Sequence, residues 1–214
     1  MNIYENNQIS KLFTNRSSIQ KIQNKLPKLF QLAELESSRA GKIGMEVGSV
    51  REKVIIALLI YKFGESNVET EIPITEPEVD VRVFNRPVSI KTITGSTFGG
   101  IKLIWTVDAE KAIEFANGYK PSCDTILAQI NWSNEGGLYY IPKDVQLAVI
   151  NEIGKNRYIK LPKAGTNPRG VEMTMEAMKK LINNPHTFKI PINWGREDIS
   201  FAVYKRWIDL WKDD

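Results

Sequence analysis

Two residues of opposite charge, Asp80 and Lys91, lie eleven positions apart on either side of a short turn. The residues around them alternate between polar and apolar, as in Glu78-Val-Asp80 and Ser89-Ile-Lys91, and this period of two is typical of β-strands. In a hairpin of these strands, Asp80 and Lys91 point to the same face, where paired side chains lie about 5 Å apart at Cβ. The spacing therefore predicts that a carboxylate and an ammonium group converge on one point.

A carboxylate beside an ammonium group suits the hydrolysis of a phosphodiester. This reaction needs a hard cation to offset the charge of the phosphate, and Mg²⁺ takes one or two carboxylates and keeps several waters. One of these waters can become the nucleophile with the help of the metal and of Lys91, which can also stabilise the charge that forms on the phosphate. The alternative interpretation is an ordinary Asp80–Lys91 pair on a solvated sheet face, where such pairs contribute little to stability.

One carboxylate is usually too few for such a metal site, so a second acid has to come from elsewhere in the chain. The position two residues before Lys91, where the familiar pattern has an acid, holds Ser89. Glu52 is the first candidate, because it lies near the start of the helix that precedes the strands and can reach the same cation from there. Glu78 is the second candidate, because alternation places it on the face of Asp80.

Helices are predicted where apolar residues recur at helical spacing after a capping residue. The first spans residues 17–40, with Ser17 or Ser18 at its start, and Pro27 is expected to kink or break it. The second spans about 50–63, is capped by Ser49 and ends at Gly64. Further helices are expected at 108–117, 143–154, 173–182 and 197–211.

Strands are predicted from alternation and from short apolar runs between turn residues. They span 68–72, 77–84, 88–93, 102–107, 124–132, 137–141 and 187–194. Trp194, Trp207 and Trp211 are expected to pack the last strand against the last helix. Without a repeat or a clear linker, this mixture predicts one α/β domain over 1–214, in which 1–48 is a helical N-terminal part and 49–214 holds the catalytic core and recognition elements.

The order of these elements resembles the PD-(D/E)xK nuclease superfamily, with Glu52 on a helix, Asp80 on a strand and Lys91 on the next strand. Within it, the chain is similar to the ThaI type of restriction endonuclease. That similarity rests on Gly44-Met-Glu-Val together with the residues just named and the Glu78-Val-Asp80 strand, and it covers most of the chain. The resemblance implies a restriction-endonuclease-like mixed β-sheet flanked by helices.

The resemblance also implies Glu52, Asp80 and Lys91 as the active-site trio of a homodimer that acts on duplex DNA. A type II enzyme of this kind cuts both strands at a short palindrome, because a two-fold symmetric protein matches a two-fold symmetric site. The resemblance suggests CGCG as this site and a cognate DNA methyltransferase as a partner that acts on it. The chain departs from the pattern at Val79, where proline is usual, and at Ser89, so the second metal ligand stays open.

Met45 offers an unbranched apolar side chain between Gly44 and Gly48, a few residues before Glu52. Apolar wedges inserted between base steps kink DNA, and the resemblance suggests this role for Met45. The alternative is a methionine that fills a gap in the core.

Two polar loops are further candidates for contact with DNA. The loop at 163–170 is bounded by glycine and offers Lys163, Thr166, Asn167 and Arg169. Arginine pairs with guanine and asparagine with adenine in the major groove, although a connecting loop with an Asn-Pro turn is the alternative. In the loop that follows the Lys91 strand, Ser96 and Thr97 are expected to donate hydrogen bonds to phosphates.

Composition limits the classes of protein that remain. The net charge of +4 favours an anionic partner, but mildly. One cysteine and one histidine exclude a disulfide framework, a cysteine zinc cluster and histidine-rich zinc hydrolases. The N-terminus lacks a signal-peptide pattern and no apolar run can span a bilayer, so we expect a cytoplasmic protein without a membrane partner.

Two other functions stay open at this point. A repair nickase or junction-cleaving nuclease would use the same fold and the same residues. A non-catalytic DNA-binding protein on a degenerate nuclease fold is favoured by Ser89 at the position of an acid.

Overall fold

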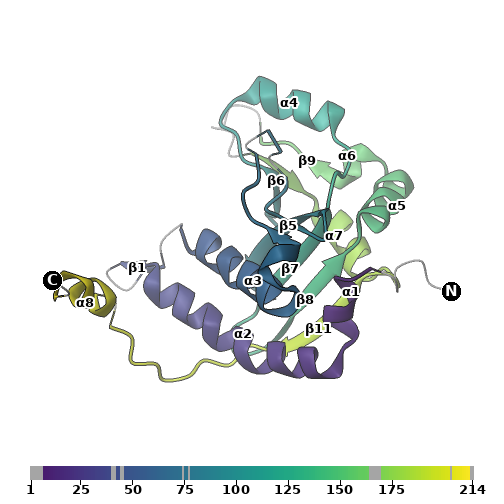
Figure 1. Ribbon diagram of the computed structural model, residues 1–214. Helices are drawn as coiled ribbons and strands as arrows, with labels where there is room; N and C mark the ends of the chain where they lie inside the picture. Colours follow the sequence, from purple (N-terminus) through teal and green to yellow (C-terminus); the bar gives the residue numbers. More distant parts are fainter. Residues whose placement is uncertain are drawn as a thin grey trace.

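The computed structural model describes residues 7–39, 42–43, 46–73, 75–76, 78–163, 170–202 and 204–212. Figure 1 shows helices on both sides of a central sheet, and α8 (Lys205–Lys212) at the end of a C-terminal segment that extends away from it. Over these ranges, every helix is too short or too polar to reach across a lipid bilayer.

The central sheet has six strands in the order β11-β8-β7-β5-β4-β3. They are β3 (Val68–Glu69), β4 (Val81–Val83), β5 (Arg86–Thr94), β7 (Asp124–Ile130), β8 (Glu135–Ile141) and β11 (Phe188–Asn193). β5 runs parallel to β7, whereas the other neighbouring strands pair antiparallel. The predicted architecture, a mixed sheet flanked by helices, is therefore confirmed.

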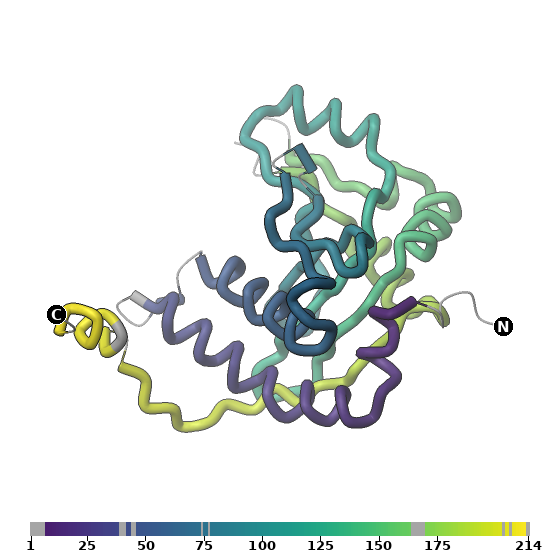
Figure 2. The backbone as a smooth tube through the Cα atoms, in the orientation of Figure 1, coloured from purple at the N-terminus to yellow at the C-terminus, as the bar shows by residue number. Residues whose placement is uncertain are grey.

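One face of the sheet is covered by the N-terminal helices, which form the lower half of Figure 1. They are α1 (Ser10–Thr14), α2 (Arg16–Glu36) and α3 (Val47–Phe63). Their buried side chains, such as Phe30 and Ile55, share one apolar cluster with Val88 and Ile90 of β5. Figure 2 follows the same helices in purple and blue beneath the sheet. This packing holds α3, which carries Glu52, against β5, which carries Lys91.

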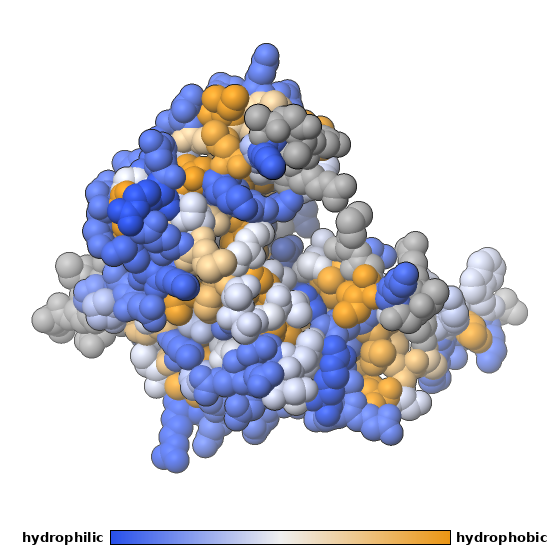
Figure 3. Space-filling view, turned by 180° about the vertical axis from the view of Figure 1, so that it is seen from behind, coloured by the Kyte–Doolittle hydropathy of each residue, from blue (hydrophilic) through white to orange (hydrophobic). Residues whose placement is uncertain are grey.

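The other face is covered by a second group of elements in the upper half of Figure 1. They are α4 (Ala109–Gly118), α5 (Lys143–Ile153), α6 (Lys155–Tyr158), α7 (Met175–Ile182) and a small sheet of β6 (Lys102–Ile104), β10 (Val171–Met173) and β9 (Ile159–Lys160). Leu127 and Tyr139 of the main sheet belong to the buried cluster on this side. Seen from behind in Figure 3, the surface is mostly hydrophilic and its outline is indented between the two halves.

The N-terminal helices differ from the prediction in where they begin and end. The cap of α2 is Asn15, whose side chain accepts a hydrogen bond from the backbone N–H of Ser18 at 2.9 Å, so the predicted caps Ser17 and Ser18 are wrong. Pro27 does not break α2. Leu26 and Phe30 beside it are buried against the sheet, and the free energy of this burial offsets the loss of the hydrogen bond that proline cannot donate. α2 ends at Glu36, before a short pair of strands, β1 (Ser38–Arg39) and β2 (Lys42–Ile43).

The second predicted helix has the expected end but a different start. α3 begins at Val47 without a side-chain cap, so the prediction that Ser49 caps it is wrong. Gly64 ends it with a φ of 86°, a conformation that glycine adopts without strain.

The turn between β4 and β5 sets the register of the predicted hairpin. Phe84 and Asn85 have φ of 50° and 63°, and two successive positive φ values are typical of a type I′ turn, whose twist matches that of a hairpin. β4 is shorter than the predicted strand 77–84, so Glu78 and Asp80 precede it. Because Val81 pairs with Val88 in an antiparallel register, the residues just before β4 lie beside the residues that follow Val88 in β5.

The C-terminal tryptophans do not pack as one group. Trp194 is buried between the rings of Phe30 and Trp132 at the end of β11. Trp207 and Trp211, in contrast, are 57% and 88% exposed on α8, so the prediction that they pack the last helix against the last strand together with Trp194 is wrong. The predicted helix 197–211 shortens to Lys205–Lys212, because its first residues extend along α2.

Gly136 in β8 lies where two other elements approach closely. A Cβ there would be 2.3 Å from the backbone oxygen of Gln129 and 2.6 Å from Nε1 of Trp194. We therefore expect Gly136→Ala to cost about 1–3 kcal/mol of stability and to lower the melting temperature by several degrees. Thermal unfolding followed by circular dichroism measures this. The control is Gly48→Ala, where a Cβ meets nothing within 4 Å; equal melting temperatures for the two variants would contradict the close approach.

Candidate active site

Asp80 lies just before β4, at the point where β5 continues without β4 beside it. The two strands pair from Val81–Val88 to Val83–Arg86, and the backbone N–H of Asp80 donates to the carbonyl of Val88 at 3.0 Å. Past this point the carboxylate of Asp80, and not the backbone of β4, accepts a hydrogen bond from β5. Its Oδ2 accepts the backbone N–H of Ile90 at 2.6 Å.

The same oxygen of Asp80 also accepts two side chains of β5. The hydroxyl of Ser89 donates at 3.2 Å and the ammonium group of Lys91 lies at 3.3 Å. Both side chains lie on the face opposite Ile90, which is fully buried against the N-terminal helices, as alternation predicts. The predicted convergence of the Asp80 carboxylate and the Lys91 ammonium is therefore present in the structure.

Glu52 reaches this pair from α3. The pKa of its half-buried carboxyl is raised to about 7: burial raises it most, the negative charge of Asp80 adds to the rise, and the positive charge of Lys91 opposes it. Both neighbours act on the Glu52 carboxyl, so a helix, the segment before β4 and the strand β5 bring three ionisable side chains to one site.

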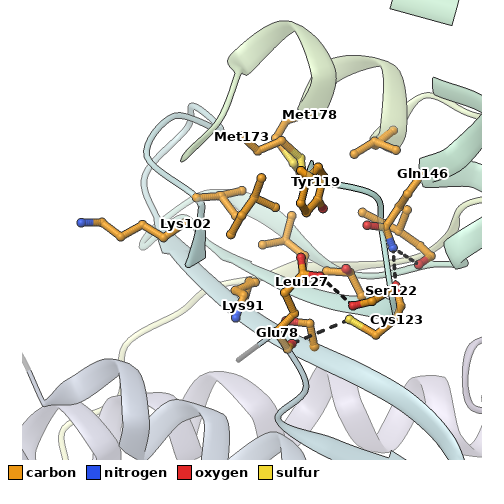
Figure 4. A pocket seen from close by; sticks show the side chains of 16 residues that line it. Glu78, Lys91, Lys102, Tyr119, Ser122, Cys123, Leu127, Gln146, Met173 and Met178 are labelled. Atoms are coloured by element: carbon orange, nitrogen blue, oxygen red, sulfur yellow. Dashed lines mark hydrogen bonds between the residues drawn. The ribbon is translucent and has the colours of Figure 1, made fainter. Parts of the chain in front are cut away.

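Glu78 is turned toward the elements that follow α4, on the face of the sheet opposite the N-terminal helices. Its Oε2 accepts the hydroxyl of Ser122 at 2.6 Å, and its carboxylate is also hydrogen-bonded to Tyr119. Figure 4 shows this group at one wall of a pocket, with Lys91 beside Glu78. Burial raises the pKa of Glu78, whereas the hydrogen bonds and the charge of Lys91 lower it. The charge of Lys91 thus acts on Glu78 as well as on Glu52, while its ammonium group pairs with Asp80.

The site offers a divalent cation two carboxylates and not a larger cluster. Within the part of the chain that the structure describes, no group of three or more aspartate, glutamate, histidine or cysteine side chains is arranged to hold a metal ion. Glu52 and Asp80 repel each other when both are ionised, and the raised pKa of Glu52 is the mark of that repulsion together with its burial. A cation between them would relieve it, and one or two carboxylates are the usual protein share of a Mg²⁺ shell. The residues therefore fit Mg²⁺.

The residues predicted to contact DNA fall partly outside the described ranges. Met45, Thr166, Asn167 and Arg169 lie there, so their prediction stays as it was. Lys163, the last described residue before the polar loop, is exposed. Ser96 and Thr97 are exposed in the loop that follows β5, which ends at Thr94, three positions after Lys91.

Tyr119 and Ser122 were not foreseen as part of the site. They follow α4 and reach Glu78 from more than forty positions along the chain. Neither belongs to a motif, and no periodic pattern distinguishes them from other polar residues, because their role comes from the fold that brings α4 beside the segment before β4.

Comparison with known proteins identifies the class to which this fold and site belong. A sequence model of the family described as "Restriction endonuclease ThaI" matches residues 12–213. A solved structure described as "Restriction endonuclease in complex with substrate DNA" is 57% identical over 96% of this chain and 99% of its own, with a TM-score of 0.90. No match was found among curated proteins. The chain has the restriction-endonuclease fold and is a site-specific nuclease. It belongs to the ThaI restriction endonuclease family.

The raised pKa of Glu52 gives a test of the site without DNA. A carboxyl whose pKa rises from 4.5 to about 7 on folding binds a proton in the folded state across that window, so its contribution to stability is present at low pH and is lost as the pH rises. We expect the melting temperature of the metal-free protein to fall from about pH 5 to pH 8 more steeply than that of Glu52→Gln.

Melting curves in a chelating buffer across this range measure the difference. Glu135→Gln is the control, because Glu135 is exposed and forms an ion pair at 3.5 Å with Lys189, between β8 and β11. Identical pH profiles for the wild-type protein and Glu52→Gln would contradict the buried, repelled carboxyl.

Proposed function

We propose that this chain is a Mg²⁺-dependent type II restriction endonuclease that hydrolyses both strands of duplex DNA at a short palindrome. The observation that carries the proposal is the meeting of Glu52, Asp80 and Lys91, with the Lys91 ammonium 3.3 Å from Asp80. Support comes from the 57% identical structure, which is described in complex with substrate DNA. CGCG is the first target to test, from the resemblance to the ThaI type.

The three side chains divide the work of hydrolysis. Glu52 and Asp80 would hold the cation, which when bound would offset charge on the phosphate and lower the pKa of a bound water. Lys91 is held beside this site by Asp80, so its ammonium group can orient the water and stabilise the charge that develops on the phosphate. Glu78 is the alternative second carboxylate, and its hydrogen bonds to Ser122 and Tyr119 favour Glu52 instead.

We also propose that three loops of the chain contact DNA. We assign the wedge between base steps to Met45, the contacts with base edges to Thr166, Asn167 and Arg169, and the contacts with phosphates to Lys163, Ser96 and Thr97. Residues that bind a partner are often placed on loops that a rigid scaffold positions.

The assembly that fits a palindrome is a homodimer with one site for each strand. Each chain acts as one domain over 1–214, since one buried cluster contains Phe30 of the N-terminal part and Ile190 of β11. A DNA methyltransferase that modifies the same sequence would protect the host DNA, and this protection does not require contact with this chain.

Loss of the trio is expected to abolish cleavage. Asp80→Asn and Lys91→Met each remove one charge of the site, and we expect cleavage of plasmid DNA in Mg²⁺ to slow by at least about a hundredfold. The controls are Glu135→Gln and Lys189→Met, which break an exposed ion pair on β8 and β11. Discrete fragments from the wild-type protein support restriction, whereas nicked circles would indicate a nickase and an unaltered plasmid of shifted mobility a DNA-binding protein.

Met45→Ala tests the wedge. Removal of the long apolar side chain is expected to weaken specific binding and to reduce distortion of the DNA. A fluorescent base analogue placed within a CGCG duplex reports unstacking, with binding measured in Ca²⁺ to prevent cleavage. Unchanged affinity and unchanged fluorescence would assign Met45 to the core instead.

A further inference from the structure

Arg51 occupies a position of α3 that a core residue would usually hold. The buried stripe of α3 consists of Arg51, Ile55 and Leu59, spaced four residues apart, and Arg51 is only 5% exposed. Burial of a charged group is costly unless it is paired, and an apolar side chain there would pack against the sheet as Ile55 does. Stability of the core therefore does not explain an arginine at this position.

The guanidinium of Arg51 is paired with a carboxylate that is itself buried. Glu34 of α2 is 3% exposed, and its Oε1 accepts hydrogen bonds from Nη2 of Arg51 and, at 2.8 Å, from Nε1 of Trp132. Its Oε2 accepts Nη2 of Arg196 at 2.7 Å. One carboxylate thus fastens α3, the turn after β7 and the segment after β11 to α2.

The other arm of the same guanidinium reaches the central sheet. Nη1 of Arg51 donates to Oγ1 of Thr94 at 3.0 Å, and Thr94 is the last residue of β5, three positions after Lys91. The planar fork of arginine can hold two partners in fixed directions, which a lysine cannot do. Arg51 therefore joins α2, α3 and β5 through one rigid group.

We propose that Arg51 is a positioning residue, which fixes Glu52 on α3 relative to Asp80 and Lys91 on the β5 side of the site through Glu34 and Thr94. The inference rests on the proposed function, since it concerns the alignment of that site. Glu52 is the next residue of the helix, so a shift or rotation of this turn moves its carboxyl directly. Hydrolysis is sensitive to such shifts, because an error of about 1 Å in position can cost a hundredfold in rate.

The test compares Arg51→Lys, which keeps the charge and loses the fork, with Arg157→Lys as the matched control. Arg157 also makes a two-pronged contact, with Glu176, but on an exposed surface. We expect Arg51→Lys to lower kcat by about 10–100-fold, to raise the Mg²⁺ concentration for half-maximal cleavage and to leave KM for DNA unchanged. The control keeps all three values.

Thr94→Val provides a second variant, which we expect to fold like the wild type because the Thr94 side chain is exposed at the end of β5. It removes the bond to Arg51 and keeps the Arg51–Glu34 pair, so we expect the same loss in a smaller degree. Thr187→Val is its control, since it deletes a hydroxyl that donates to the carbonyl of Leu181 at 2.6 Å, away from the site.

Folded Arg51→Lys and Thr94→Val proteins that cleave like the wild type, with the same Mg²⁺ dependence, would overturn the inference and leave the proposed function standing. A rise in KM with kcat unchanged would also overturn it, because that pattern reports DNA binding and not alignment of the site. Failure of the wild-type protein to cut duplex DNA in Mg²⁺ would instead remove the proposed function, and the inference with it.

Discussion

The carboxylate of Asp80 is the interaction on which the site depends. β4 is short, and beyond Val88 the edge of β5 has no strand of the hairpin to pair with. Asp80 fills this place, because its Oδ2 accepts the backbone N–H of Ile90 and also holds the side chains of Ser89 and Lys91. The oxygen that continues the sheet therefore also fixes the lysine, so the chemistry is built into the end of a strand and not added on a mobile loop.

A second constraint is the burial of two acids side by side. α3 holds Glu52 near Asp80. The pKa of Glu52 is raised because its carboxyl is partly buried and because the negative charge of Asp80 disfavours a second negative charge beside it. Such an arrangement contributes little to the stability of the metal-free protein, but it prepares a place for a divalent cation. Ser89 stands where the PD-(D/E)xK pattern has an acid, and we propose that Glu52 of α3 takes the place of that acid.

Local patterns predicted the parts of the site that depend on local structure. Alternation along two short strands correctly placed Asp80 near Lys91, because a hairpin with a tight turn fixes their register over a few residues. It could not show that Glu78 turns toward Ser122 and Tyr119, since those partners come from a distant part of the chain. The sequence likewise could not predict the exposure of Trp207 and Trp211. Tryptophans in an amphipathic segment are expected to be buried, and only the fold shows which of them other elements cover.

We propose above all that Glu52 and Asp80 bind one cation beside Lys91. The decisive measurement is a crystal structure of the protein with duplex DNA and Mn²⁺, solved with data collected at the manganese edge. We expect an anomalous peak between the carboxylates of Glu52 and Asp80, next to a phosphate of the DNA. A peak held by Glu78 with Ser122 instead, or Glu52 turned away from an occupied site, would contradict it.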